Sequence, residues 1–311
     1  MKHPNPPVKV SISLITYNHK EFIVEALESI LMQEVDFKYE IIIGDDCSSD
    51  GTQEILKEYK QKYPEIIQLI LHPRRYDEIP GRTNNMTNLY ACRGEYIAML
   101  DGDDYWISKD KLQTQVDFLD KNQDYVFSFH DALFISKEKD FKPYLHSENR
   151  EFLKKDNTFE HKDIAEKSFM PTSTLLYRNN FKEEFPEWFR KVYTADYALQ
   201  LLVTQYGKIK YFKALLSSRR IITDSFTSFS NHTENYIPLR VNELKIYREN
   251  FEAVKDSNSN SMLSYVFFRH SIYLQKKKSF LKMFRYCLKA ISADKKYLKV
   301  YFKLIGKNFL K

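Results

Sequence analysis

Three carboxylates crowd four positions of the stretch MLDGDDYW, residues 99 to 106. Asp101, Asp103 and Asp104 directly follow an apolar run, where their mutual repulsion is unfavourable unless a cation offsets it. Mg²⁺ and Mn²⁺ prefer hard oxygen ligands and bind through one or two carboxylates together with phosphate oxygens and water. The stretch therefore predicts a site for a metal diphosphate, and the competing interpretation is a solvated turn after a strand.

A second acidic stretch, DDCSSDG, covers residues 45 to 51 and again follows an apolar run. An acid just beyond a buried strand can accept hydrogen bonds from a nucleobase or a ribose. The structural alternative is that Asp50 with Gln53 forms a helix N-cap pair. In the stretch ITYN, Thr16 and Tyr17 could line a nucleotide pocket with a hydroxyl and a ring, although a lone aromatic near a strand end more often packs.

Alternating strand and helix patterns in the first hundred residues must position these stretches. Amphipathic helices are expected between apolar runs that predict strands at residues 8 to 15, 39 to 44, 66 to 71 and 95 to 100. This alternation predicts an α/β fold with a parallel sheet covered on both faces. Ligands of such sheets bind beyond the carboxyl ends of the strands, which is where the three polar stretches lie.

Further sequence patterns predict the start of the first helix and the elements after residue 109. Asn18, with Glu21 three residues later, predicts a capping box for the first helix. After a helix near residues 109 to 121 the pattern is less regular, with strand signals in YVFSFHDALFIS and STLLYR and a helix signal in YTADYALQLLVTQY. From about residue 241 the pattern is helical.

Cysteine content and apolar runs bear on the compartment. The three cysteines include no CxxC pair, so we expect neither a disulfide framework nor a zinc knuckle, and a reducing compartment fits best. The N-terminal segment MKHPNPPVKV has no apolar h-region, and no run of 18 apolar residues occurs. We therefore expect no signal peptide, no membrane span and a cytoplasmic location.

The order and spacing of the motifs are more specific than any one of them. ITYN, then DDCSSDGT about thirty residues later, then GEYIAMLDGDDYW about fifty residues beyond that, resembles the inverting family 2 glycosyltransferases over roughly residues 8 to 225. The resemblance implies the A-type glycosyltransferase fold, a Rossmann-like and mostly parallel sheet with helices on both faces. We expect a nucleotide-sugar-binding domain over residues 1–240 and a basic helical extension over residues 241–311.

The resemblance also implies an activity. Such an enzyme moves a sugar from a nucleoside-diphosphate donor, a UDP-sugar first among them, to an acceptor hydroxyl of a polysaccharide or glycolipid precursor. It does so with inversion, by in-line displacement assisted by a divalent metal, Mn²⁺ or Mg²⁺. The alternative is a non-catalytic membrane-surface or scaffold protein that keeps a degenerate sugar-nucleotide pocket.

Site residues follow from the positions that match the family's motifs. Thr16 and Tyr17 match the loop that packs against the base, and Asp46 matches the residue that bonds the base. Arg82, in GRTNN, lies where the family often has a basic residue facing the nucleotide. Asp101 and Asp103 match the DxD pair, the first near the ribose and the second on the metal and its diphosphate. Support of the loop and of the acceptor side is assigned to Asp104, Tyr105 and Trp106.

The general base is expected in TADYALQLL, residues 194 to 202, which resembles the family's later acidic motif. Asp196 is the candidate, against the alternative that it only complements a helix dipole. The chain departs from the family further on, because no His follows SSRRIITDSFTS until His232. Arg219 or Arg220 is expected at the diphosphate instead. His130 is left out of the predicted site as a hydrogen-bonded, partly buried histidine.

The basic character of the chain belongs to its last part. From residue 271 to residue 311 there are twelve Lys or Arg and one acid, a charge of +11 that leaves about −5 for the rest. Basic residues surround one apolar helical face, which suits peripheral contact with an anionic inner-membrane surface. The alternative is a helical pair packed on the catalytic domain. We expect no nucleic-acid partner, because no recognised binding motif accompanies the charge. The apolar face comprises Phe280, Met283, Phe284, Cys287, Leu288 and Ile291.

Two rival enzyme classes lack their motifs. A nucleotidyltransferase that makes sugar nucleotides would carry a glycine-rich loop after the first strand, whereas ITYNHKEF contains no glycine. A dehydrogenase would carry GxGxxG there, and that motif is absent.

Overall fold

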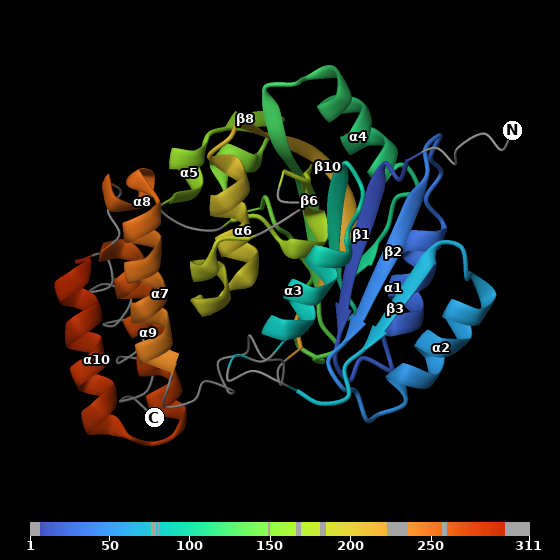
Figure 1. Cartoon of the computed structure of the whole chain (residues 1–311). Coiled ribbons are helices and arrows are strands. Elements are labelled where there is room, and N and C mark those ends of the chain that lie inside the picture. Colours follow the sequence, from blue (N-terminus) through green and yellow to red (C-terminus); the bar gives the residue numbers. More distant parts are fainter. Residues whose placement is uncertain are drawn as a thin grey trace, which may run out of the picture. The chain divides into compact units, whose positions relative to one another are not determined.

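A computed structural model of the whole chain gives the fold. It describes residues 7–75, 79, 81–148, 150–165, 169–180, 185–222, 236–256 and 260–295. In this part of the chain the strands form one ten-stranded sheet, in the order β3-β2-β1-β4-β9-β6-β10-β5, with β7 beside β6 and β8 beside β10 (Figure 1). The strands are β1 (Val10–Thr16), β2 (Tyr39–Asp45), β3 (Ile67–Leu71), β4 (Tyr96–Asp101), β5 (Tyr105–Trp106), β6 (Tyr125–Ile135), β7 (Tyr144–Leu145), β8 (Asn157–Phe159), β9 (Leu176–Arg178) and β10 (Lys208–Arg220).

Helices alternate with the strands in the first part of the chain and follow one another in the last part. The α-helices are α1 (Ile23–Leu31), α2 (Thr52–Lys62), α3 (Arg82–Ala91), α4 (Lys111–Lys121), α5 (His161–Ala165), α6 (Ala195–Thr204), α7 (Tyr236–Asn250), α8 (Glu252–Asp256), α9 (Asn260–Lys276) and α10 (Phe280–Ala293). The 3₁₀ helices are η1 (Glu151–Leu153), η2 (Thr172–Thr174) and η3 (Glu187–Lys191). No helix in the described ranges is both long enough and apolar enough to cross a membrane.

Strands β1 to β4 are mutually parallel, as the continuous apolar runs predicted. β1 pairs with both β2 and β4, and β2 pairs with β3. β9 is antiparallel to β4 and β6, and β10 is parallel to β6. In register, Thr16 lies opposite Asp45 and Ile15 lies opposite Asp101, so the carboxyl ends of these three strands meet at one edge.

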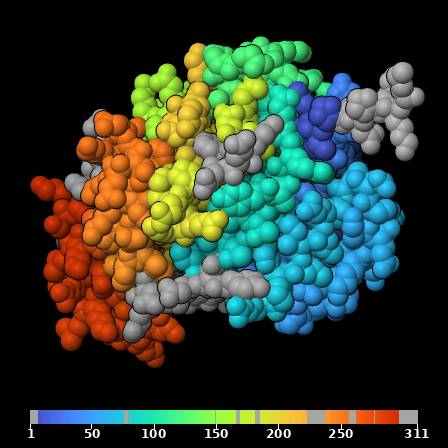
Figure 2. Space-filling model, in the orientation of Figure 1, coloured from blue at the N-terminus to red at the C-terminus, as the bar shows by residue number. Residues whose placement is uncertain are grey.

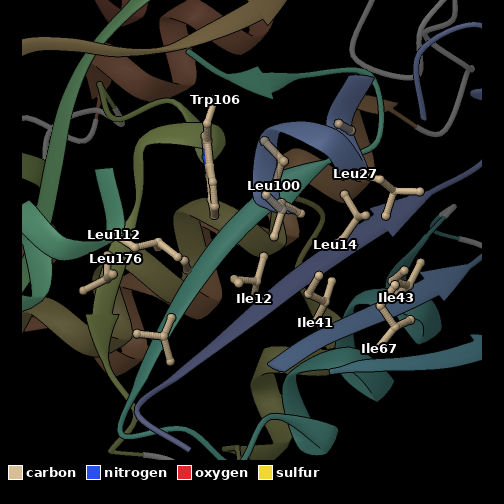
Figure 3. Packing of buried hydrophobic residues seen from close by; sticks show 14 of the residues in the cluster. Ile12, Leu14, Leu27, Ile41, Ile43, Ile67, Leu100, Trp106, Leu112 and Leu176 are labelled. Carbon is tan, nitrogen blue, oxygen red and sulfur yellow. The ribbon is translucent and has the colours of Figure 1, made fainter. Parts of the chain in front are cut away.

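Alternation along the strands sends side chains to two layers. Ile12 and Leu14 of β1, with Ile41 and Ile43 of β2 and Leu100 of β4, join a core cluster that also contains residues of α1, α2 and α4 (Figure 3). The intervening positions face α3: the Asn88 side-chain amide lies 3.4 Å from the Ser13 hydroxyl, and it also donates to the backbone oxygens of Leu14 and Ile42, each at 3.0 Å. Helices therefore cover both faces of the parallel strands, and the predicted fold class is confirmed.

The capping box predicted for α1 is wrong. The helix begins at Ile23 after Phe22. Asn18 has a left-handed backbone, with φ of 53°, and its side chain accepts a hydrogen bond from Ser49 N at 2.9 Å. Glu21 forms an ion pair with Lys137. Asn18 thus ties the first loop to the second instead of capping a helix.

The chain divides into two compact units. One comprises residues 1–161, 169–190 and 195–221, and the other comprises residues 162–168, 191–194 and 222–311. The boundary expected after residue 240 lies within α7, whereas the division between the units lies before residue 222. The roles expected for the two parts of the chain stay predictions.

Candidate functional site

Asp101, Asp103 and Asp104 form the acidic corner at the end of β4. The turn is held by backbone hydrogen bonds from Gly102 N to Ile15 O at 2.9 Å and from Asp104 N to Asp101 O at 3.0 Å. Just beyond it, β5 pairs with Ser217 and Ser218 of β10. The carboxylates are therefore fixed between two well-paired strands.

Negative charge in the acidic corner is only partly offset. Removal from solvent, followed by repulsion from Asp103, raises the pKa of Asp101 to about 7; Asp196 adds to the rise, and Arg219 opposes it. Burial, followed by repulsion from Asp103 and Asp101, raises the pKa of Asp104 well above its ordinary value. Charge that has so little compensation is the electrostatic setting in which a cation binds.

The fit of a divalent cation can be tested on these ligands. No group of three or more His, Cys, Asp or Glu within the described residues could hold a metal by itself. Two hard carboxylates, Asp101 and Asp103, are the number that Mg²⁺ or Mn²⁺ uses when phosphate oxygens supply the remaining ligands. The corner therefore fits a cation that arrives with a diphosphate and does not fit a resident all-protein metal site.

Asp46, Tyr17 and Arg75 come together beside the ends of β1 and β2. Arg75 Nε donates to Asp46 Oδ2 at 2.9 Å, and its guanidinium carbon lies 4.1 Å from the centroid of the Tyr17 ring. Asp46 is buried, and its backbone N–H donates to Thr16 O at 3.0 Å. Sequence reasoning missed Arg75, although it stands in HPRRY immediately after the third strand.

The neighbouring acid, Asp45, is committed to the loop. Its carboxylate accepts hydrogen bonds from Ser48 N at 2.9 Å and from Gln53 Nε2 at 2.6 Å, and also from the Ser48 hydroxyl. Asp50 instead accepts from Thr52 N at 3.0 Å and from the Thr52 hydroxyl at 2.6 Å. The alternative N-cap pair of Asp50 with Gln53 is therefore not formed, because Gln53 donates to Asp45.

Thr16 brings the first loop against the acidic corner. Its buried hydroxyl lies 3.2 Å from Nδ1 of His19. A Cβ on Gly102 would come within 2.7 Å of Thr16 Oγ1 and 2.9 Å of His19 Nδ1, so the two loops touch only because residue 102 is glycine. Burial lowers the pKa of His19, while Asp103 opposes that shift. His19 was missed in the sequence, although it follows ITYN directly.

Arg82 begins α3 and is buried. It follows Gly81, whose φ of 76° is in the left-handed region that glycine tolerates. The helix packs against β1 and β2, the strands that carry Thr16 and Asp46 at or beside their ends. The role of Arg82 toward a nucleotide stays a prediction.

The two arginines at the end of β10 have different surroundings. Arg220 N donates to Asp104 Oδ1 at 2.8 Å, and its guanidinium donates to Asp103 O at 2.7 Å and pairs with Glu25. Arg219 lies with its guanidinium carbon 5.6 Å from the Phe134 ring centroid and acts electrostatically on the pKa values of Asp101 and Asp104. Arg220 thus holds the loop, and Arg219 is the better candidate for a diphosphate contact.

Asp196 lies in the first turn of α6, as TADYALQLL predicted. Its Oδ1 accepts from Tyr197 N at 2.9 Å, and its Oδ2 lies 3.4 Å from the Thr172 hydroxyl. Because Asp196 contributes to the raised pKa of Asp101, the fold brings this carboxylate within electrostatic range of the acidic corner. The two lie 95 positions apart in the sequence.

Trp106 and His130 are buried, and their hydrogen bonds are to neighbouring parts of the protein. Trp106 is buried, with Nε1 donating to Ser173 O at 2.9 Å and its backbone N–H to the Ser29 hydroxyl at 3.1 Å. His130 is buried in β6, and its Nδ1 lies 2.9 Å from Asp131 O. His232 lies outside the described residues.

Comparison with known proteins identifies the family. Residues 11–185 match the sequence model of Glycosyl transferase family 2. The chain belongs to glycosyltransferase family 2. This match covers more than half of the chain and includes every predicted site residue except Asp196 and the arginines of β10. The predicted family is thus confirmed.

Relatives of this family 2 chain align over part of their length. An uncharacterized protein of Mycobacterium tuberculosis is 39% identical over 138 residues, which cover 43% of this chain and 39% of that protein. The poly(ribitol-phosphate) beta-N-acetylglucosaminyltransferase TarS of Staphylococcus aureus is 32% identical over 117 residues, covering 37% of this chain and 19% of TarS. The chain therefore matches about two fifths, or less, of the length of these relatives.

Solved structures share the fold over most of the chain. Residues 1–349 of S. aureus TarS in complex with UDP-GlcNAc align with a TM-score of 0.57 at 18% identity, covering 95% of this chain and 92% of that one. The mannosyltransferase PcManGT of Pyrobaculum calidifontis, in complex with GDP-Man and Mn²⁺, aligns with a TM-score of 0.50 at 15% identity, covering 94% and 79%. At these identities the comparison shows a common fold.

Proposed function

We propose that this chain transfers a sugar, with inversion, from a nucleoside-diphosphate donor to an acceptor hydroxyl. The observation that carries the proposal is the clustering of acids at the site: Asp101 and Asp103 lie in one hydrogen-bonded turn after β4, and the charges of Arg219 and Asp196 act on Asp101 as well. Asp101, Asp103 and Arg219 would bind the diphosphate together with its metal, and Asp196 would serve as the general base. Family membership supports the same reaction class.

The donor in this proposal is a UDP-sugar. Asp46 would accept a hydrogen bond from the base, and the exposed ring of Tyr17 would stack on it, with Thr16 behind the loop. Arg75 already bridges Asp46 and Tyr17, so base binding would have to share or displace that contact. The complex of TarS with UDP-GlcNAc supports the choice of donor.

Asp103 and Asp101 would hold Mn²⁺ or Mg²⁺. When bound, the cation offsets the negative charge that develops on the departing diphosphate. The Mn²⁺ complex of PcManGT supports this assignment. Arg219 would add a second positive charge to the same oxygens, which is consistent with the lowering effect of its charge on the pKa of Asp101.

Asp196 would accept the proton of the acceptor hydroxyl. As that oxygen forms its bond to the anomeric carbon, the bond from the anomeric carbon to the diphosphate oxygen breaks, and one displacement inverts the configuration. The Thr172 hydroxyl lies 3.4 Å from Asp196 Oδ2 and would orient the carboxylate. The acceptor is proposed to be a polysaccharide or glycolipid precursor, in line with the polymer acceptor, poly(ribitol-phosphate), that is named for TarS.

Changing Asp196 should lower the rate of sugar transfer without weakening donor binding. The Asp196→Asn variant is expected to bind UDP with Mn²⁺ like the wild type but to lose roughly 10²- to 10⁴-fold in the rate of transfer. Asp103→Ala should lose the Mn²⁺-dependent part of UDP binding, and chelation of the metal should do the same to the wild type. Calorimetry and a UDP-release assay measure these quantities.

Asp117→Asn is the matched control, because Asp117 is an exposed acid on α4 whose carboxylate accepts from the Gln113 side-chain amide at 2.7 Å. It should leave both quantities unchanged. Unaltered turnover in Asp196→Asn, or a wild type that binds UDP but transfers no sugar from any UDP-sugar, would contradict the proposal and favour a non-catalytic pocket.

A further inference from the structure

Helix α10 carries four large apolar side chains that the structure leaves in solvent. The fractional exposures are 59% for Phe280, 91% for Leu281, 53% for Phe284 and 53% for Leu288. At 100° per residue these positions fall within one arc of about 100°, which we call the apolar stripe. Figure 2 shows the atoms of α10 in red at the surface of the molecule.

The neighbouring face of α10 packs on α9. Cys287 and Ala290 are buried against α9, where Phe267 and Phe268 pack on them. The Ser264 hydroxyl donates to Ala290 O at 2.5 Å and fixes the two helices together. The apolar stripe thus extends this packed face further around the helix, and the packing between α9 and α10 does not cover it.

Cations border the apolar stripe. Lys277, Lys278, Lys282, Arg285 and Lys289 are all exposed, and none forms an ion pair with a residue that the structure describes. Lys278 has a left-handed backbone, with φ of 56°, in the turn between α9 and α10. Glycine is the usual residue at a left-handed position after a helix. Lysine at residue 278 instead adds a positive charge to the turn. From residue 260 to residue 295 the sequence has eight Lys or Arg and one acid, Asp294.

We propose that α10 docks on the surface of an anionic phospholipid bilayer, lying in its plane with the apolar stripe among the acyl chains. An apolar arc next to a basic arc is the pattern of an interfacial helix. Uncompensated cations of one sign are complementary to anionic headgroups. A stable protein interface, by contrast, needs roughly 20 to 30 residues a side, far more than four side chains on one helix.

Vesicle co-sedimentation tests the proposal independently of the transferase activity. The full-length protein should bind vesicles made of equal parts phosphatidylglycerol and phosphatidylcholine, and salt should weaken the binding. It should bind phosphatidylcholine vesicles at least tenfold more weakly. Lys282→Gln with Arg285→Gln should lower the partition constant for the anionic vesicles about thirtyfold, because each cation contributes about 1 kcal/mol, a factor of about 5.4.

A variant of the apolar stripe and a control variant test the apolar part of the proposal. Leu281→Asp with Phe284→Asp should abolish vesicle binding without lowering the melting temperature, because both side chains are exposed. Lys57→Gln with Lys121→Gln removes two exposed lysines elsewhere and should change nothing. Equal binding to neutral and anionic vesicles, or no effect of either α10 variant, would overturn the proposal. So would a dimer in lipid-free solution that Leu281→Asp with Phe284→Asp dissociates, since the apolar stripe would then join two copies of the chain.

Discussion

Arg219 and Arg220 are consecutive residues of β10, and alternation along a strand sends their side chains to opposite faces of the sheet. Arg220 contacts the rings of Phe22 and Tyr105, with its guanidinium carbon 4.9 and 4.7 Å from the ring centroids. Arg219 lies over Phe134. The sequence SSRR contains both residues without telling them apart, and the register of β10 separates their roles.

Replacing each arginine by glutamine should therefore give different losses. Arg219→Gln should weaken Mn²⁺–UDP binding roughly tenfold to hundredfold, because a charge-assisted hydrogen bond contributes about 1.5–3 kcal/mol, and should leave the melting temperature unchanged. Arg220→Gln should lower the melting temperature, since Asp103 O and the Glu25 carboxylate lose their donor. Calorimetry with UDP and thermal unfolding measure the two effects. A melting temperature that falls equally in both variants would contradict this division.

Glycine at residue 44 lets α3 approach β2. A Cβ there would come within 2.1 Å of Asn84 Oδ1 and 2.4 Å of Asn88 Oδ1. Asn84 Nδ2 donates to Gly44 O at 2.9 Å, so the helix is held by buried amides and not only by apolar packing. At the level of elements, these contacts set the position of α3 and hence of Arg82 at its first residue.

A double-mutant cycle tests this contact between helix and strand. Gly44→Ala should lower the free energy of unfolding by about 1–3 kcal/mol, because it overpacks the interface. Asn84→Ala should also destabilise, since it removes the hydrogen bond to Gly44 O. In the double variant the first clash is relieved, so its loss should be smaller than the sum of the single losses. Denaturant titrations that give strictly additive losses would show that residue 44 and α3 do not touch.

At the scale of the whole molecule, two buried histidines make the free energy of unfolding depend on pH. Burial, followed by the charge of Lys111, lowers the pKa of His130 to about 3. Burial also lowers the pKa of His146 to about 4. Because an unfolded histidine titrates near 6.5, the unfolded state binds protons between pH 6.5 and these values while the folded state does not. Stability should thus fall as the pH drops below about 6.5.

His130→Gln should reduce this acid sensitivity. His130 alone costs up to about 5 kcal/mol between pH 6.5 and pH 3, since each pKa unit corresponds to about 1.4 kcal/mol. The variant should therefore unfold at a lower pH than the wild type, measured by tryptophan fluorescence at constant ionic strength. Its stability at pH 7 provides the reference. Coincident acid-unfolding midpoints would show that His130 is not buried in its neutral form.

Local sequence patterns were sufficient to predict the buried parallel strands, the family and the position of Asp196. Apolar runs marked β1 to β4, the motif order marked the family, and the acid opening a helix marked Asp196, because periodicity and strand ends are properties of short segments. Tertiary structure alone decided that Asp45 holds its loop while Asp46 meets Arg75, that Asn18 bridges two loops, and that Asp196 comes within electrostatic range of Asp101. These outcomes depend on strand register and on contacts between residues tens of positions apart, which no local pattern specifies.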